Sequence, residues 1–174
     1  MKSLAQTDRE IFNWLFKLTA RRNCRWVKLL SKTGDGQIYL LIGLLLWLFE
    51  PQDGALFLYT ALFAYSLELP IYIVLKKHLK RQRPCDILQN FRAHITPSDK
   101  FSLPSGHTAA AFLMASIISS FYPSVAIAVY LWAGFIGLSR VLLGVHYPGD
   151  ILAGAALGLT ISALSVATFA PHLS

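Results

Sequence analysis

Residues 54–75 read GALFLYTALFAYSLELPIYIVL, and Glu68 is their only formally charged side chain. A helix of about 20 mostly apolar residues is long enough to cross the hydrocarbon core of a bilayer. The whole chain has the same character: 55% of its 174 residues are apolar, only 14% are charged, and the mean hydropathy is +0.50. This composition is too apolar for an ordinary soluble domain. We therefore expect an all-α integral membrane protein that forms a single domain, residues 1–174.

Other uncharged runs on both sides of this segment predict further transmembrane helices. Pro123 divides the longest of them, because proline interrupts a helix. Gly154 and Gly158 lie four residues apart in the last run, a spacing that lets helices pack closely in lipid. We expect five transmembrane helices, which cover residues 36–50, 54–76, 105–121, 124–143 and 149–170.

The N-terminal segment 8–32 has a different pattern from these runs. Its apolar side chains recur at helical spacing, but Arg21, Arg22 and Arg25 lie near its middle. Charged side chains are costly in the bilayer centre, whereas amphipathic helices lie in the interface with basic residues toward the headgroups. We therefore expect amphipathic interfacial helices over residues 8–32. The alternative is a sixth transmembrane helix of low hydrophobicity.

Positive charge is concentrated in two blocks, residues 1–35 and 76–100, each with a net charge of +5. Basic blocks alone are also typical of nucleic-acid-binding proteins, but the long apolar runs are not. We expect membrane lipids as partners and no nucleic acid, and the sequence leaves the oligomeric state open. With five crossings, the loops 76–104 and 140–149 open on the same membrane face as the N-terminal segment.

The loops on that face contain three short polar motifs. They are KKHLKRQRP at 76–84, PSGH at 104–107 and SRVLLGVHYPGD at 139–150. In this order and spacing they resemble the type 2 phosphatidic acid phosphatase family, which also includes the vanadium haloperoxidases. We expect no cofactor and no metal, because the chemistry described below needs none and the remaining histidines show no metal-ligand spacing. The matching positions in this sequence are Lys76, Arg83, Ser105, Gly106, His107, Arg140, His146 and Asp150.

Five of these residues suit the binding of phosphate. A phosphoryl group in transfer carries charge on three oxygens and needs several fixed hydrogen-bond donors. Lys76, Arg83 and Arg140 supply positive charge, and the planar guanidinium donates two parallel hydrogen bonds to phosphate. Ser105 and Gly106 open a helix whose unpaired amides and dipole favour an anion. Gly106 is also expected to leave room for the phosphate.

The other three residues suit covalent catalysis. His146 is the expected nucleophile, and a phosphohistidine would divide one difficult displacement into two. Asp150 lies four residues later, so its carboxylate is placed to accept the other ring N–H and fix the tautomer. His107 is the expected general acid for the leaving oxygen and then the base for water. The family resemblance implies the same roles.

We therefore expect a phosphatase that acts on a lipid-linked phosphate. The two basic blocks would attract anionic headgroups. The resemblance implies undecaprenyl pyrophosphate, phosphatidylglycerophosphate, phosphatidic acid or lipid A phosphates as candidate substrates. The alternatives are a phosphoryl transferase with an acceptor other than water, and a non-enzymatic protein that binds or transports lipid headgroups. A vanadium oxidase is disfavoured because the motifs open on a membrane surface.

Two features have competing interpretations. We expect the chain in the cell (inner) membrane, but the family usually exposes its site to the periplasm or exterior. All 16 lysines and arginines lie on the motif face in the five-helix arrangement, which predicts a cytoplasmic site. Glu68, inside a predicted span, is either a functional intramembrane acid or the partner of a basic residue near Lys76.

Overall fold

The computed structural model describes residues 3–87 and 92–169. Its elements in chain order are α1 (Leu4–Lys17), α2 (Arg25–Lys32), α3 (Gly36–Phe49), α4 (Gly54–Leu79), α5 (Pro84–Ile87), α6 (Gly106–Phe121), the short 3₁₀ helix η1 (Pro123–Val125), α7 (Ala126–Leu142) and α8 (Pro148–Phe169). One isolated bridge joins Gln82 to Phe101, and the described residues contain no β-strand. The predicted all-α class is confirmed.

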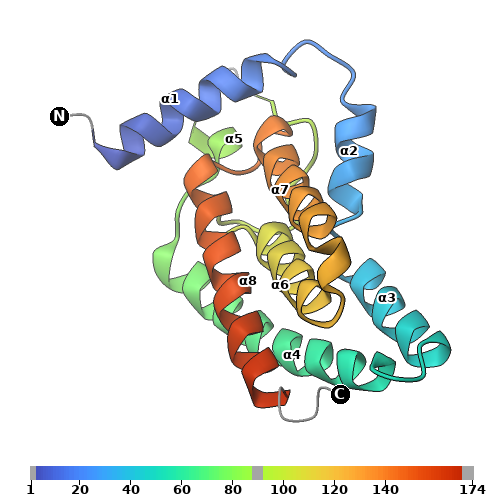
Figure 1. Cartoon of the computed structure of the whole chain (residues 1–174). Coiled ribbons are helices and arrows are strands. Elements are labelled where there is room, and N and C mark those ends of the chain that lie inside the picture. The colour runs from blue at the N-terminus through green and yellow to red at the C-terminus, as the bar shows by residue number, and fades with distance from the viewer. Residues whose placement is uncertain (1–2, 88–91, 170–174) are drawn as a thin grey trace.

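Helix α6 lies at the centre of the bundle and packs against α4, α7 and α8 (Figure 1). The side chains that it buries are mostly small or aliphatic, and the apolar ones are Ala109, Ala111, Leu113, Met114, Ala115 and Ile117. Small side chains let neighbouring helices approach closely, while the larger ones fill the space between them. This packing fixes the position of the α6 N-terminus, which carries one of the three motifs.

Helices α6 and α8 form the most extensive helix contact, and two glycines let them approach closely. A Cβ added at Gly154 would lie 2.5 Å from the carbonyl oxygen of Ser105, and one at Gly158 would lie 2.2 Å from that of Ala109. No side chain fits in so small a gap. The predicted glycine pair of the last transmembrane run therefore lies at a helix–helix interface, as its spacing indicated.

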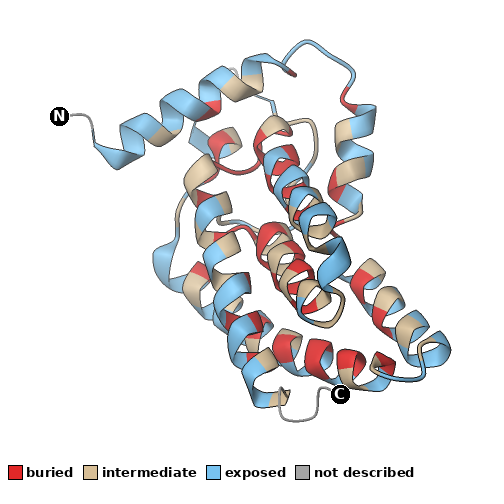
Figure 2. Ribbon diagram, in the orientation of Figure 1, coloured by how far each residue is buried: buried red, intermediate tan, exposed pale blue. Residues whose placement is uncertain are grey.

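The outward faces of the helices are largely exposed (Figure 2), and they carry many large apolar side chains. Large exposed side chains on α3, α7 and α8 include Leu48, Phe49, Leu131, Phe135, Leu152 and Leu164. Three helices are long and apolar enough to cross a membrane: α4, η1 with α7, and α8. Helices α3 and α6 are apolar but have only 14 and 16 residues. At 1.5 Å per residue they reach roughly 21 and 24 Å, less than the roughly 30 Å core, so the count of five crossings stays a prediction.

Helix α4 is longer than the run that predicted it. It continues through Pro70 and past Lys76 to Leu79, and it ends at Lys80, which has a left-handed φ of 46°. The predicted end at residue 76 followed the first charged side chain. Because Lys76 is buried, with 6% of its surface exposed, the charge does not mark the end of the helix but places an ammonium group inside the bundle.

The N-terminal segment forms two amphipathic helices, α1 and α2. Helix α1 begins four residues earlier than expected because Ser3 and Gln6 form a capping box. It crosses the end of the bundle where α7 stops and α8 starts (Figure 1). Phe12 is buried there against the ring of Tyr147, whereas Trp14 is exposed. The location of these helices in a membrane interface stays a prediction.

Candidate active site

The three motifs meet at one end of the bundle, where helices begin or stop. Lys76 lies in the last turn of α4 and Arg140 in the last turn of α7. His107 and Asp150 lie in the first turns of α6 and α8. His146 lies in the short connection between α7 and α8. Helix packing thus gathers residues that are up to 74 positions apart in the chain.

His146 is buried, and its surroundings indicate which ring nitrogen carries the proton. Only 2% of its surface is exposed, and Arg83 Nη1 lies 3.3 Å from its Nε2. A guanidinium group can only donate, so Nε2 is the acceptor and Nδ1 carries the hydrogen. Arg83 Nη1 also donates to the carbonyl oxygen of Val145 at 2.7 Å, which fixes the guanidinium beside the ring. Nε2 therefore has the lone pair that a nucleophile needs.

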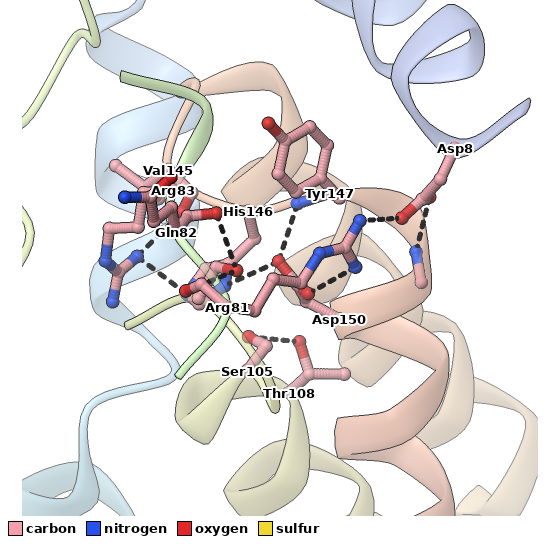
Figure 3. A network of polar contacts seen from close by, with 12 residues as sticks. Asp8, Arg81, Gln82, Arg83, Ser105, Thr108, Val145, His146, Tyr147 and Asp150 are labelled. Atoms are coloured by element: carbon pink, nitrogen blue, oxygen red, sulfur yellow. Dashed lines mark hydrogen bonds and ion pairs between the residues drawn. The ribbon is translucent and has the colours of Figure 1, made fainter. Parts of the chain in front are cut away.

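Asp150 lies on the opposite side of the imidazole. Its Oδ2 is 3.5 Å from His146 Nδ1, longer than an ordinary hydrogen bond, and it accepts the backbone N–H of Tyr147 at 2.8 Å (Figure 3). The carboxylate is fully buried. The sequence-predicted pair is thus brought together with Asp150 facing the nitrogen that carries the hydrogen, at a distance longer than a hydrogen bond.

A second arginine holds Asp150 in place, and sequence reasoning did not select it. Arg81 Nη1 donates to Asp150 Oδ1 at 2.8 Å, and its Nη2 binds Asp8 of α1 (Figure 3). The guanidinium also lies 4.3 Å from the centre of the Tyr147 ring. Asp8 in turn accepts the N–H of Gly149 at 2.8 Å. The N-terminal helix α1 is therefore linked to the carboxylate beside His146.

Asp99 forms ion pairs with two of the three cations that were expected to bind phosphate. Lys76 Nζ lies 2.8 Å from its Oδ2, and Arg83 Nη2 lies 2.7 Å from its Oδ1. Tyr72 also donates to this carboxylate at 3.0 Å. Burial alone would raise the pKa of Asp99. The hydrogen bonds from Lys76 and Arg83 outweigh burial and hold this pKa at about 2. Asp99 is thus a permanent anion that occupies the donors of Lys76 and Arg83.

Arg140 is the third expected cation and has a different environment. It is 95% buried, and the single hydrogen bond that its side chain makes to a described residue is from Nη1 to Ser31 Oγ, at 2.7 Å. Its Nε is buried without a hydrogen-bond partner, and no carboxylate in the described ranges forms an ion pair with it. Arg140 borders a cavity of about 290 Å³ together with Lys28, Lys32 and His107. The cavity therefore has a cationic wall.

His107 has an acidic partner of its own. Its Nε2 lies 2.9 Å from Oδ1 of Asp35, the residue that precedes α3. Both residues border the cavity beside Arg140, and both also border a larger cavity of about 610 Å³ between α3, α4 and α6. His146 is not among the lining residues of either cavity, and Arg83 Nη1 lies against its Nε2. The two histidines thus lie at one end of the bundle in different environments.

Ser105 and Gly106 are placed differently from the expectation. The Ser105 hydroxyl accepts a hydrogen bond from Thr108 at 2.9 Å, and its N–H donates to the Asp150 carbonyl. A Cβ at Gly106 would lie 2.9 Å from the Tyr72 ring, so the glycine makes room for this side chain rather than for phosphate alone. No side chain caps α6, which leaves its N-terminus suited to an anion.

Three site residues were missed for reasons that can be stated. Asp35 and Asp99 are single acids in connecting segments, 72 and 23 residues from the partners His107 and Lys76. Such distances leave no spacing signal in the sequence. Arg81 lies two residues before Arg83, but its place in a basic run beside a span is typical of a headgroup anchor.

A match to a known family covers most of the same region. The family model of the PAP2 superfamily matches residues 54–172, more than half of the chain. The chain belongs to the PAP2 superfamily. The predicted resemblance to type 2 phosphatidic acid phosphatases is therefore confirmed, and the matched region contains all three motifs.

Several PAP2 relatives have named activities. The chain is 36% identical over 98 residues to decaprenylphosphoryl-5-phosphoribose phosphatase of Mycobacterium tuberculosis, covering 54% of this chain and 51% of that protein. It is 31% identical over 137 residues to the bacitracin transport permease protein BcrC of Bacillus licheniformis, covering 78% and 67%. It is 30% identical over 121 residues to a lipid A 1-phosphatase of Rhizobium johnstonii, covering 67% and 48%. The first and third matches thus span about half of the relative.

Solved PAP2 structures share the architecture. LpxE of Aquifex aeolicus superposes with a TM-score of 0.80 at 26% identity, over 91% of this chain and 93% of that one. The first transmembrane PAP2 type phosphatidylglycerolphosphate phosphatase from Bacillus subtilis gives a TM-score of 0.75 at 24% identity, over 100% and 89%, and supports the fold alone. Together with the apolar helices, these likenesses identify an integral membrane protein of the PAP2 fold.

Proposed function

We propose that this PAP2 protein is a membrane-embedded phosphatase that hydrolyses a phosphate monoester or pyrophosphate of a lipid through a phosphohistidine. The observation that carries the proposal is Arg140, a buried guanidinium with an unpartnered Nε on the wall of a cavity that His107 also borders. A buried cation without an anion is costly, and bound phosphate would relieve that cost. Named relatives that act on lipid phosphates support the same proposal.

The first chemical step is the transfer of phosphate to His146. Nε2 forms a bond to phosphorus, the bond from phosphorus to the lipid oxygen breaks, and its electron pair stays on that oxygen. His107 gives the leaving oxygen a proton while Asp35, 2.9 Å away, stabilises the charged ring. For Nε2 to reach phosphorus, the guanidinium of Arg83 moves from the ring to the phosphate.

The second step releases phosphate and restores the enzyme. Neutral His107 removes a proton from water, the water oxygen bonds to phosphorus, and the nitrogen–phosphorus bond breaks. Its electron pair returns to Nε2 of His146. Asp150, close to Nδ1, stabilises the positive ring of the phosphohistidine in both steps. The cations and the α6 N-terminus would hold the three oxygens of the transferring group.

The substrate would be a lipid with its phosphate at the membrane surface. Decaprenylphosphoryl-5-phosphoribose and lipid A occur in the names of the relatives, and undecaprenyl pyrophosphate, phosphatidylglycerophosphate and phosphatidic acid are further candidates. We place the protein in the cell (inner) membrane with its site at one surface.

The test is phosphate release by the purified full chain from these lipid phosphates in mixed micelles. We expect His146→Ala to lower kcat by at least about 10³-fold, because the nucleophile is lost. His78→Ala, at an exposed position of α4, is the matched control and should act like the wild type. Retained phosphate release in His146→Ala would overturn the phosphohistidine mechanism.

The same assay separates the two alternative functions. A phosphoryl transferase would release little phosphate until an alcohol acceptor is added. A protein that only binds or transports headgroups would release none and would keep its lipid binding in His146→Ala. Free phosphate from the wild type without an acceptor contradicts both alternatives.

A further inference from the structure

Three hydrogen-bond donors converge on the carboxylate of Asp99. Lys76 Nζ and the Tyr72 hydroxyl lie 2.8 and 3.0 Å from its Oδ2, and Arg83 Nη2 lies 2.7 Å from its Oδ1. Lys76 also donates to the Tyr72 hydroxyl oxygen, so these two side chains meet the anion together. Two cations and a hydroxyl around a pair of oxygens are the kind of donor set that holds a phosphoryl group.

The contact between Lys76 and Asp99 also bears on Glu68, which lies two turns earlier in α4. Within residues 3–87 and 92–169 Glu68 forms no ion pair, and Lys76 is paired with Asp99. The interpretation of Glu68 as the partner of a basic residue near Lys76 was therefore wrong.

The two cations are buried, whereas the carboxylate that binds them is open to solvent. The side chains of Lys76 and Arg83 expose 7% and 3% of their surface, and that of Asp99 exposes 36%. A buried cation without an anion is costly, so some anion must stay beside these two. Asp99 supplies one from the solvent side, on the irregular segment between α5 and α6.

The backbone of this segment is held independently of the Asp99 carboxylate. Arg83 Nε donates to the Asp99 carbonyl oxygen at 3.0 Å. Three residues later, the N–H of Ser102 donates to the carbonyl oxygen of Arg81 at 2.8 Å. Rotation of the Asp99 side chain toward solvent would therefore release its three donors while the segment stays in place.

Arg83 has too few unused donors to bind both Asp99 and a phosphate. Its Nε carries one N–H and each terminal nitrogen carries two. Nε and Nη2 bind Asp99, and Nη1 binds the Val145 carbonyl oxygen and lies against His146 Nε2. These contacts with described residues leave a single N–H, on Nη2. Two parallel hydrogen bonds to phosphate thus require the carboxylate to leave, and the like charges would repel each other in any case.

Tyr72 places its hydroxyl beside the N-terminus of α6. A Cβ added at Gly106, the first residue of that helix, would lie 3.0 Å from the Tyr72 hydroxyl oxygen. Tyr72 also borders the larger cavity together with His107. The hydroxyl therefore lies between Lys76 and the uncapped helix end, whose amides favour an anion. The sequence did not single out Tyr72, because an aromatic residue in an apolar run is typical of a membrane span.

Resting on the proposed phosphatase function, we propose that Lys76, Arg83 and Tyr72 form one phosphate cradle, which the Asp99 carboxylate occupies until substrate phosphate displaces it. Tyr72 is then a further phosphate-binding residue, and Asp99 is an internal competitor. The substrate binds only the protein from which the carboxylate has withdrawn, so Asp99 lowers the apparent affinity for phosphate. If Asp99 served only to position the cations, it would raise that affinity.

The test measures the binding of orthovanadate, a mimic of the phosphoryl transition state, to the purified full chain in detergent micelles by titration calorimetry. Asp99→Asn keeps the size of the side chain and removes its charge. We expect it to bind orthovanadate about tenfold more tightly than the wild type, because no anion competes for the cradle. Asp86→Asn, which removes an exposed acid of α5, is the matched control and should bind like the wild type.

Adding Tyr72→Phe to Asp99→Asn tests the hydroxyl with the competitor already gone. Its loss should weaken orthovanadate binding about tenfold, the effect of one hydrogen bond to a charged group. Tyr59→Phe, on the exposed surface of α4, should leave the affinity unchanged in the same background. Asp99→Ala, which is also expected to bind more tightly than the wild type, replaces Asp99→Asn should the latter not fold.

Three results would overturn the cradle. The first is a wild type that binds no orthovanadate. The second is weaker or unchanged binding after the loss of the Asp99 carboxylate, which would mean that Asp99 only positions the cations. The third is an affinity that Tyr72→Phe does not change. Phosphate release from lipid phosphates is measured on the same samples, and a wild type that binds orthovanadate but releases no phosphate would contradict the proposed function alone.

Discussion

His146 is a histidine whose surroundings disfavour a proton. Burial, together with the nearby guanidinium of Arg83, lowers the pKa of His146 to about 4, although Asp150 acts in the opposite direction. In the unfolded chain a histidine has a pKa near 6.5. Between these values the unfolded state binds a proton that the folded state does not. Stability from this group is therefore lost as the pH falls from about 6.5 toward 4.

We predict that His146 stays neutral, and thus nucleophilic, down to a pH near 4. Proton–carbon NMR of protein labelled in its histidine rings would follow the titration, and the His146→Ala variant would identify the signal. A signal that titrates near pH 6.5 would show that the ring is not shielded as the structure indicates.

The site residues within motifs were predictable, whereas their partners were not. The four-residue spacing of His146 and Asp150 across a Pro-Gly step is a local signal, and the structure places the two side chains 3.5 Å apart. Asp99 and Asp35 contact Lys76, Arg83 and His107 only because distant segments fold back onto them. Single acids in loops have no periodicity from which such contacts could be predicted.

At the scale of elements, α1 contacts the catalytic end of the bundle through Asp8, in addition to packing there through its apolar face. Asp8 joins Arg81 to the N–H of Gly149, next to the turn that carries Asp150. We predict that Asp8→Ala lowers kcat about tenfold with little change in KM, because Arg81, which binds Asp150, loses a charged partner. Phosphate release over a range of lipid concentrations separates the two constants.

Two further variants show whether Asp8 acts by positioning. Asn13→Ala, at an exposed position of α1, should behave like the wild type. Asp8→Asn keeps an oxygen for Gly149 and should recover part of kcat. An Asp8→Ala variant that changes KM alone would mean that α1 only recruits lipid.

The limits of the helices followed the uncharged runs closely but not at every end. Helices α3 and α6 begin and end within a residue of the predicted ranges. Helix α4 differs by three residues, since Lys76 is buried by tertiary contacts and the helix continues. Neither the hydrophobic periodicity nor the positions of the charged residues indicate that Lys76 is buried.

At the scale of the whole molecule, the distribution of basic residues predicts which side of the membrane the site faces. The positive-inside bias places the motif end in the cytoplasm. Cys85 lies at this end, in α5, and is partly exposed. We predict that an impermeant maleimide labels Cys85 in permeabilised cells but not in intact ones. Burial raises the pKa of the Cys85 thiol, so the reaction should be run above neutral pH.

The control for this experiment is a cysteine at the other end of the bundle. Gln52 lies in the exposed turn between α3 and α4. A Gln52→Cys, Cys85→Ser variant should be labelled in intact cells. Labelling of Cys85 in intact cells would place the site outside, as the family habit implies.

The convergence of the three motifs at one end was predictable from counting crossings, since an even number of spans separates the loops. The number of crossings was harder to predict. Helices α3 and α6 are apolar throughout but shorter than a bilayer core, and hydropathy alone does not distinguish a short span from a buried helix.

The glycine contact between α6 and α8 has a consequence for how a lipid enters. Backbone atoms touch at Gly154 and Gly158, and the Ser105 N–H donates to the Asp150 carbonyl at 3.0 Å, so the two helices cannot separate without breaking both. Helix α3 is held to α4 in the same way, because a Cβ added at Gly54 would lie 2.1 Å from the Leu46 carbonyl oxygen, and it forms a wall of the larger cavity. Both helix pairs thus stay together as units, so the approach of a bulky lipid leaves the frame of α6 and α8 beside His146 in place.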